Sequence, residues 1–176
     1  SDLIVSPNID DALTCDNYFM LMPGQFVLDY LGEDVSEFET DMSVLEAMPN
    51  INKDDLELCK LYRRFERTIK PDREEKIFKG DIYVLVDKGV YSATEGCAMC
   101  CKSTGFDTLV GERTGGDGIG GINPVYVDMP NSGIMFTFRI SYSLNPDGSS
   151  NEEYGTEPDV ECTSLEARTK CIEIIN

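Results

Sequence analysis

Histidine and tryptophan are absent from this 176-residue sequence. Without histidine, the chain by itself can hold neither a serine–histidine–aspartate triad nor a mixed Cys/His zinc site. Long apolar runs are missing too, since no window approaches the eighteen or more apolar residues that a membrane helix needs. The first residues also lack a basic segment followed by an apolar stretch. We therefore expect no membrane segment, signal peptide, metal site or cofactor in this chain.

Positive charge is scarce, with 15 Lys and Arg against 33 Asp and Glu and a formal net charge of −18. Such a balance excludes nucleic acid and anionic membranes as partners, because polyanionic surfaces require clustered bases. Residues 1–52 contain no Lys or Arg at all. A solvated acidic face explains this segment, and a cation-attracting surface or a contact with a basic partner domain is the alternative.

Apolar residues make up 41% of the chain, which is long enough for one substantial core. We expect one domain, or one piece of one. We divide it into a mixed and helical lead-in (1–79), an α/β core (80–162) and a C-terminal helix (163–176).

Seven cysteines are present, and Cys97 and Cys100 form the nearest approach to a metal-binding pair. They lie inside a predicted helix and no second pair follows, so we expect no metal there. Cys97 and Cys101 are one helical turn apart and should share a buried face with Ala93. We expect reduced thiols in small apolar packing, with a disulfide at Cys162 or Cys171 as an open alternative.

Two predictions concern the lead-in. The apolar clusters Tyr18–Met22 and Phe26–Leu28 flank Pro23-Gly24 and predict a hairpin. From Asn52 onward, apolar residues recur at helical spacing and Pro71 follows them, which predicts an amphipathic helix. The apolar positions of that helix are Leu58, Tyr62, Phe65 and Ile69.

The core predicts a strand, helix and strand at Ile82–Val86, Ser92–Thr104 and Thr108–Gly111. The first strand is apolar on consecutive residues, as in a sheet covered on both faces. Gly105 ends the helix, and the order of elements is typical of a parallel crossover unit. A hairpin at 125–140 and a closing helix over Leu165–Ile175, opened by the capping pair Thr163 and Glu166, follow.

Ser92 is the most informative residue, because it stands between the predicted strand and helix. A hydroxyl held there is a candidate nucleophile, since the N–H groups at the start of the helix and its dipole face any oxyanion that forms. The alternative is that Ser92 only caps the helix, because serine is a favoured N-cap residue.

Four blocks follow the serine block G-V-Y-S-A-T-E at 89–95. They are T-L-V-G-E-R-T-G-G-D-G at 108–118, M-P-N-S-G at 129–133, N-P-D-G at 145–148 and E-E-Y-G-T-E-P-D-V at 152–160. In this order, from about Gly80 to Val160, the set resembles the core of the tail-specific, or C-terminal processing, serine peptidases, whose relatives include the tricorn protease core.

The resemblance implies an α/β fold of the crotonase and Clp-protease type, with flanking helices, a β-hairpin and a C-terminal helix. It implies that Ser92 is the nucleophile and that the backbone N–H of Ala93 is an oxyanion donor. Many members use a lysine base, but Asp117 stands at that position. The tricorn-like branch uses an upstream histidine oriented by a glutamate that matches Glu152, or Glu153 one residue later; an exposed acidic turn is the alternative for both.

Other candidates are weaker. Lys88 and Lys102 do not stand at the position that the catalytic lysine occupies in the motif of the resembled family. The glycines at 115–121 lack a G-K-[ST] ending and are expected to let the backbone approach a peptide substrate rather than hold phosphate. Asn145–Gly148 predicts a turn rather than a calcium site. Glu95 is expected to stabilise the helix N-terminus.

The sequence thus predicts the C-terminal part of a peptidase catalytic domain that acts on peptides or proteins. The general base would come from an upstream segment of the same protein, so this piece alone should be nearly inert. Relatives of this kind imply an exported or cell-surface bacterial protein. A catalytically inactive peptide-binding or scaffold module on the same fold is the alternative, and a thiol hydrolase lacks a base and an electropositive setting.

Overall fold

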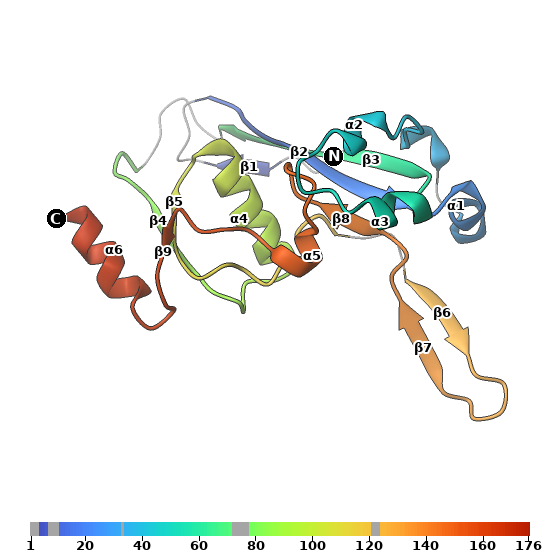
Figure 1. Cartoon of the computed structure of the whole chain (residues 1–176). Helices are drawn as coiled ribbons and strands as arrows, with labels where there is room; N and C mark the ends of the chain where they lie inside the picture. The colour runs from blue at the N-terminus through green and yellow to red at the C-terminus, as the bar shows by residue number, and fades with distance from the viewer. Residues whose placement is uncertain (1–3, 7–10, 33, 72–77, 121–123) are drawn as a thin grey trace. The chain divides into compact units, whose positions relative to one another are not determined.

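The computed structural model describes residues 4–6, 11–32, 34–71, 78–120 and 124–176 (Figure 1). The chain forms two compact units. The first contains residues 1–17, 65–118 and 151–176, and the second contains residues 18–64 and 119–150. The predicted division at residues 79 and 162 stays a prediction. Among the described residues, no helix combines the length and apolar character needed to cross a bilayer.

The first unit contains a three-stranded parallel sheet in the order β4-β5-β9. Its strands are β4 (Tyr83–Val86), β5 (Thr108–Gly111) and β9 (Val160–Glu161). Helix α4 (Ala93–Thr104) connects β4 to β5, and its C-cap Gly105 adopts φ 64°. The predicted strand–helix–strand unit is confirmed.

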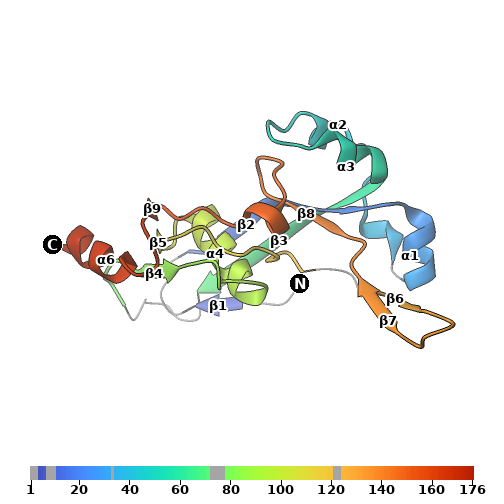
Figure 2. The ribbon, with the colours of Figure 1, turned by 60° about the horizontal axis from the view of Figure 1, so that its bottom comes forward.

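Helices α4 and α6 (Ala167–Ile175) lie on opposite sides of this sheet in both views of the ribbon (Figure 1, Figure 2). On the α4 side, Val86, Ala98, Cys101 and Leu109 form a buried cluster. Leu85 of β4 is nevertheless 47% exposed. The expectation of a sheet covered on both faces is therefore only partly met, because α6 leaves this residue accessible.

The C-terminal helix is shorter than predicted. The Thr163 hydroxyl donates to Glu166 Oε2 at 2.6 Å, but the helix starts only at Ala167 and no side chain caps it. The capping pair thus forms its side-chain contact without the reciprocal backbone contacts of a capping box.

The second sheet has the order β1-β3-β2-β8. Strand β1 (Ile4–Ser6) pairs in parallel with the end of β3 (Leu61–Pro71). Strand β8 (Tyr142–Leu144) pairs antiparallel with β2 (Leu13–Met22).

The predicted amphipathic helix after Asn52 is wrong beyond its first turns. Helix α3 (Lys53–Leu58) begins with the Asn52 side chain accepting from Asp54 N at 3.1 Å, but it ends before strand β3. Leu58 is 73% exposed while Tyr62 is fully buried, so these residues do not share one apolar face. Tertiary pairing overrides the helical spacing, because β3 obtains its hydrogen-bond partners from strands distant in sequence.

The predicted N-terminal hairpin is also wrong. Residues 18–22 complete the long strand β2, and α1 (Gln25–Leu31) follows instead of a returning strand. Pro23-Gly24 therefore separates a strand from a helix.

The second unit has its own core, which is built from β2, α2 (Ser43–Glu46), α3, β3 and β8. The remaining short elements are η1 (Val35–Glu37) in this unit and α5 (Asn151–Tyr154) in the first. The core residues are Phe19, Leu21, Leu45, Leu56, Cys59, Tyr62 and Leu144.

The predicted hairpin at 125–140 is confirmed as β6 (Val125–Asp128) and β7 (Met135–Phe138), joined by the register pair Val127–Phe136. Its two strands extend away from the sheet of this unit (Figure 1). The turn predicted at Asn145–Gly148 is closed by a hydrogen bond from Gly148 N to Asn145 O at 3.0 Å.

Candidate active site

Ser92 occupies a strained junction between β4 and α4. Its backbone adopts φ 58° and ψ −122°, a region that L-residues other than glycine rarely enter. Such a conformation costs about 1–3 kcal/mol and persists only where the surrounding structure enforces it. The residue is exposed. The serine thus stands at the surface on a sharp turn.

The Ser92 side chain does not act as a helix cap. Although Ser92 is the N-cap of α4, its side chain makes no capping hydrogen bond within the described structure. Its carbonyl accepts the first helical bond, from Gly96 N at 2.9 Å. Ala93 is the first helical residue and is exposed. Its N–H lies among the first N–H groups of a helix, which have no intrahelical acceptor.

The glycine segment after β5 holds this junction in place. Ser92 N donates to Gly116 O at 3.0 Å and Gly115 N donates to Val90 O at 2.7 Å, which forms a short parallel bridge. Gly116 has φ 88°, and a Cβ built on it would lie 2.1 Å from Asn151 O and 3.2 Å from Glu152 Cα. Only glycine fits between the serine turn and α5.

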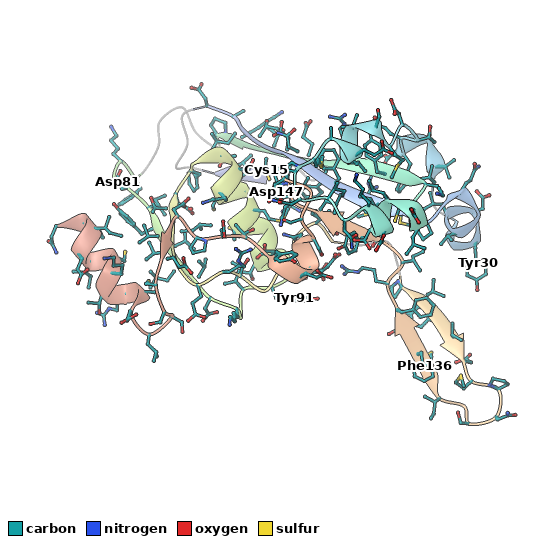
Figure 3. The ribbon with its side chains drawn as sticks, in the orientation of Figure 1. Cys15, Tyr30, Asp81, Tyr91, Phe136 and Asp147 are labelled. Atoms are coloured by element: carbon teal, nitrogen blue, oxygen red, sulfur yellow. The ribbon has the colours of Figure 1, made fainter. Side chains whose placement is uncertain are left out.

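Glu152 is therefore brought toward Ser92 through Gly116. It is half-buried on α5, whereas Glu153 is exposed. Figure 3 labels Tyr91, the neighbour of Ser92, beside α5. This placement is consistent with Glu152, rather than Glu153, as the carboxylate of the site, and its role stays a prediction.

A buried polar network lies beneath the serine turn, and the sequence analysis missed it. Glu95 is 0% exposed, and its Oε1 accepts hydrogen bonds from Thr156 Oγ1 at 2.7 Å and Asn151 Nδ2 at 3.3 Å. Asn151 Oδ1 in turn accepts from Gly118 N at 2.9 Å. Glu95 is thus not a surface carboxylate at a helix end. It ties the first turn of α4 to α5 and to the loop after α5, and Asn151 extends the network to the glycine loop.

The same loops are joined a second time. Thr156 N donates to Thr114 Oγ1 at 2.6 Å, and Thr114 N donates to Thr156 O at 3.1 Å. Both threonines are buried. The signal available in the sequence was that Thr156 occupies one of the variable positions of G-x-x-P-D, a polar residue inside an otherwise rigid block.

One glycine of the loop packs against α4. A Cβ on Gly118 would lie 2.3 Å from Met99 Sδ and 2.7 Å from Glu95 Cγ. Gly118 therefore lets the loop approach α4 closely, and the expectation that the loop glycines let the backbone approach a peptide substrate stays a prediction. Asp117, at the position of the family lysine, is buried with φ 66°.

Lys102 and Asp159 form a structural pair away from the serine turn. Lys102 Nζ donates to Asp159 Oδ1 at 2.5 Å, and Leu109 N donates to Asp159 Oδ2 at 2.8 Å. Burial acts to raise the pKa of Asp159, but the hydrogen bonds from Lys102 and Leu109 and the lysine charge outweigh it and lower the pKa. The aspartate of the G-x-x-P-D block thus fastens α4 to β5 and β9.

The expected packing of the helix cysteines is partly wrong. Cys97 and Ala93 are exposed, while Cys101 is buried. All seven cysteines are free thiols. Among the described residues, no three Cys, Asp or Glu side chains gather as metal ligands.

Solved structures share this fold. Over 97% of this chain and 38% of the other, it matches mature CPAF complexed with lactacystin, with a TM-score of 0.54 and 19% identity. Mature CPAF alone matches over 96% and 37% with a TM-score of 0.53 and 20% identity. A candidate peptidase from Parabacteroides merdae matches over 66% and 38%, with a TM-score of 0.50 and 21% identity.

This chain spans less than two fifths of the length of these solved proteins. The comparison confirms the predicted mixed α/β fold of the Clp-protease type. A comparison with curated protein sequences finds no match. The model of peptidase family S41 matches residues 38–162, which include the serine turn, the glycine loop and the G-x-x-P-D block. The chain therefore belongs to peptidase family S41.

Proposed function

We propose that this chain is the part of a serine peptidase that supplies the nucleophile, with Ser92 attacking the peptide carbonyl to form an acyl-enzyme. The observation that carries the proposal is the backbone of Ser92, at φ 58° and ψ −122°, with an exposed residue whose side chain is not used as a cap. Strain of this kind is enriched at active sites, where the surrounding structure enforces it. Membership of family S41 supports the same reaction class.

Ala93 N–H is the proposed oxyanion donor. It opens α4, so its N–H has no helical acceptor and the positive end of the helix dipole adds to its field. A donor that meets the negative charge only as the tetrahedral intermediate forms lowers the barrier selectively; removing one such donor typically costs about 10²–10³ in rate.

The general base is proposed to come from a segment upstream of these residues, as in the tricorn-like branch. The chain has no histidine. Lys102 is already paired with Asp159, and a buried aspartate, Asp117, replaces the family lysine. Glu152 is the proposed orienting carboxylate, because its backbone abuts Gly116, the partner of Ser92 N.

The substrates are proposed to be peptides or proteins, cleaved either internally or near their C-termini, by an exported or cell-surface bacterial enzyme. This stretch alone should be nearly inert, because a triad that lacks its base retains only residual catalysis.

The test uses the full-length protein, a fluorophosphonate probe and a peptide library. Ser92→Ala should abolish covalent labelling and reduce peptide hydrolysis by about 10⁴-fold or more. Thr94→Ala is the matched control, since Thr94 is an exposed hydroxyl residue two positions along. Equal hydrolysis by the wild type and Ser92→Ala would remove Ser92 from the mechanism. Peptide binding without labelling or hydrolysis in the wild type would favour the inactive binding module.

A further inference from the structure

Three cysteines of helix α4 belong to two thiol pairs. Cys97 Sγ lies 4.0 Å from Cys101 Sγ; Cys97 is exposed and Cys101 is buried. Cys100 is hydrogen-bonded instead to Cys15 of β2, which Figure 3 labels close to α4. Cys15 and Cys100 are only 0% and 3% exposed. Solvent therefore reaches one thiol of the first pair, whereas both thiols of the second pair are buried.

The contact with Cys101 favours a thiolate on the exposed Cys97. The hydrogen bond between the two sulfurs lowers the pKa of Cys97 to about 6, although burial and the Asp107 carboxylate act in the opposite direction. The positive charge of the Arg67 guanidinium also lowers the pKa of Cys97. It lies beside α4, since a Cβ on Gly96 would be 3.2 Å from Arg67 Nη1. Cys97 is therefore an accessible thiol whose pKa is lowered by a hydrogen bond and by a nearby cation, as is typical of reactive cysteines.

Ordinary packing does not account for Cys97. A buried cysteine behaves as a small apolar residue, and Cys101, Cys100 and Cys15 fit that description. Cys97 is exposed, although its sulfur lies beside another thiol. Its exposure therefore distinguishes it from these three buried cysteines.

We infer that Cys97 and Cys101 form an oxidant-sensitive thiol pair, a modification site independent of the peptidase reaction. The Cys97 thiolate attacks one oxygen of a hydroperoxide, which breaks the O–O bond, gives a sulfenic acid and releases hydroxide or alkoxide, which takes up a proton. The Cys101 thiol then attacks the Cys97 sulfur, its proton leaves with the hydroxyl as water, and a disulfide forms. Two thiols lose two electrons, and the peroxide is reduced to water and water or alcohol.

The bridge requires a local distortion of α4. Residues four apart in a helix are separated by about 6 Å along the axis, which lies within the Cα separations that disulfides span. Their Cβ atoms are about 5–6 Å apart in a regular helix and must close to about 3.5–4.5 Å. The two sulfurs must approach from 4.0 Å to about 2.05 Å, so one helical turn must unwind locally.

Alkylation of the reduced 176-residue chain by iodoacetamide tests the reactive thiol. At pH 6, Cys97 should react about tenfold faster than the half-buried Cys162 and Cys171, because a large fraction of Cys97 is thiolate at that pH. The Cys97 rate should level off above pH 7, once its thiolate is fully formed. A Cys97 rate that matches theirs at every pH would overturn the inference.

Hydrogen peroxide followed by mass spectrometry tests the bridge. Trypsin releases residues 89–102 as one peptide that contains Cys97, Cys100 and Cys101, and cleavage after Met99 separates Cys97 from the other two. The two halves of this peptide should stay linked by the disulfide until a reductant is added. Cys101→Ser should instead leave a sulfenic acid on Cys97 that dimedone traps, and the matched control Cys100→Ser should keep the bridge. A Cys97–Cys100 bridge, or no bridge in the wild-type chain, would overturn the inference whether or not the variants fold.

Discussion

Folded proteins usually bury apolar side chains and expose polar ones. The serine turn and the β6–β7 hairpin both depart from this pattern, in opposite ways. Around the turn, polar side chains are buried, with Glu95, Asn151 and Thr156 all at 5% exposure or less. On the hairpin, apolar side chains are exposed, with Phe136 and Phe138 at 52% and 50%. Buried polar groups and clustered exposed apolar groups are the informative exceptions in a fold.

The two regions differ in whether their residues contact segments that are distant in sequence. Each buried polar group of the turn is tied to a loop distant in sequence, as when Thr156 binds Glu95 across 61 positions. Among the described residues, the two strands of the hairpin pair with each other alone, and their register places Val125, Val127, Phe136 and Phe138 on one face. Figure 3 labels Phe136 on this hairpin. A substitution at the turn should therefore destabilise several segments of the fold, whereas a substitution on the hairpin should affect the hairpin alone.

Removal of Glu95 should give the largest change in stability. Glu95→Ala leaves the Thr156 hydroxyl and the Asn151 amide without their acceptor and empties a fully buried volume, so we expect a loss of about 3 kcal/mol. Denaturant unfolding of the 176-residue chain measures it. Glu95→Gln, which keeps an acceptor oxygen, should lose less. A loss below about 1 kcal/mol for Glu95→Ala would contradict the conclusion that the buried polar groups at the turn stabilise the fold more than the hairpin does.

Ser92→Gly should stabilise the fold while removing the proposed nucleophile. Glycine adopts φ 58° without strain, which recovers about 1–3 kcal/mol, while its greater freedom in the unfolded chain costs about 0.5–1 kcal/mol. We expect a net gain of about 1 kcal/mol in thermal or denaturant unfolding. Ser92→Ala keeps its Cβ and should show no gain; equal stability of both variants would mean that the turn is unstrained.

Asp159→Asn should cost about 1 kcal/mol at neutral pH, because the partly exposed Lys102 pair contributes little and one backbone hydrogen bond is weakened. The folded-state pKa of Asp159 is lowered, so its contribution is present above about pH 4 and disappears as the pH falls through that lowered pKa. The difference in unfolding free energy between the wild type and Asp159→Asn should therefore shrink between pH 7 and pH 3. A difference that is constant with pH would contradict this.

Phe136→Ser on the hairpin should have the smallest effect. The side chain is already half exposed and pairs with Val127 across the strands, so we expect a loss of about 0.5 kcal/mol or less. Denaturant unfolding is again the measurement, with Thr137→Ser on the opposite face as control. A loss comparable to that of Glu95→Ala would show that the hairpin supports the fold more than its exposure indicates.

Local signals in the sequence were sufficient for several elements. The run from Ser92 to Gly105 contains its own start and stop, so α4 was predicted within one residue. The hairpin was predictable because its strands flank Pro130-Asn131-Ser132-Gly133 and pair with each other. The ordered blocks that include Ser92 indicated the peptidase family, and the family model confirmed it.

Other elements depend on partners that no local pattern reveals. Leu61–Pro71 is a strand because β1 and β2 supply its hydrogen bonds, although its apolar spacing suits a helix. Arg67 of that strand lies beside α4, which gives Cys97 an electropositive neighbour that sequence spacing could not show.

The sequence by itself determined where a serine meets a helix, since that depends on a strand, a turn and a helix stop within about two dozen residues. Only the tertiary structure decided how that serine is held. The strain at Ser92, the closeness of Gly116 to α5 and the burial of Glu95 arise from hydrogen bonds between residues up to 61 positions apart. Such contacts form only when the whole chain has folded and water has left the interior.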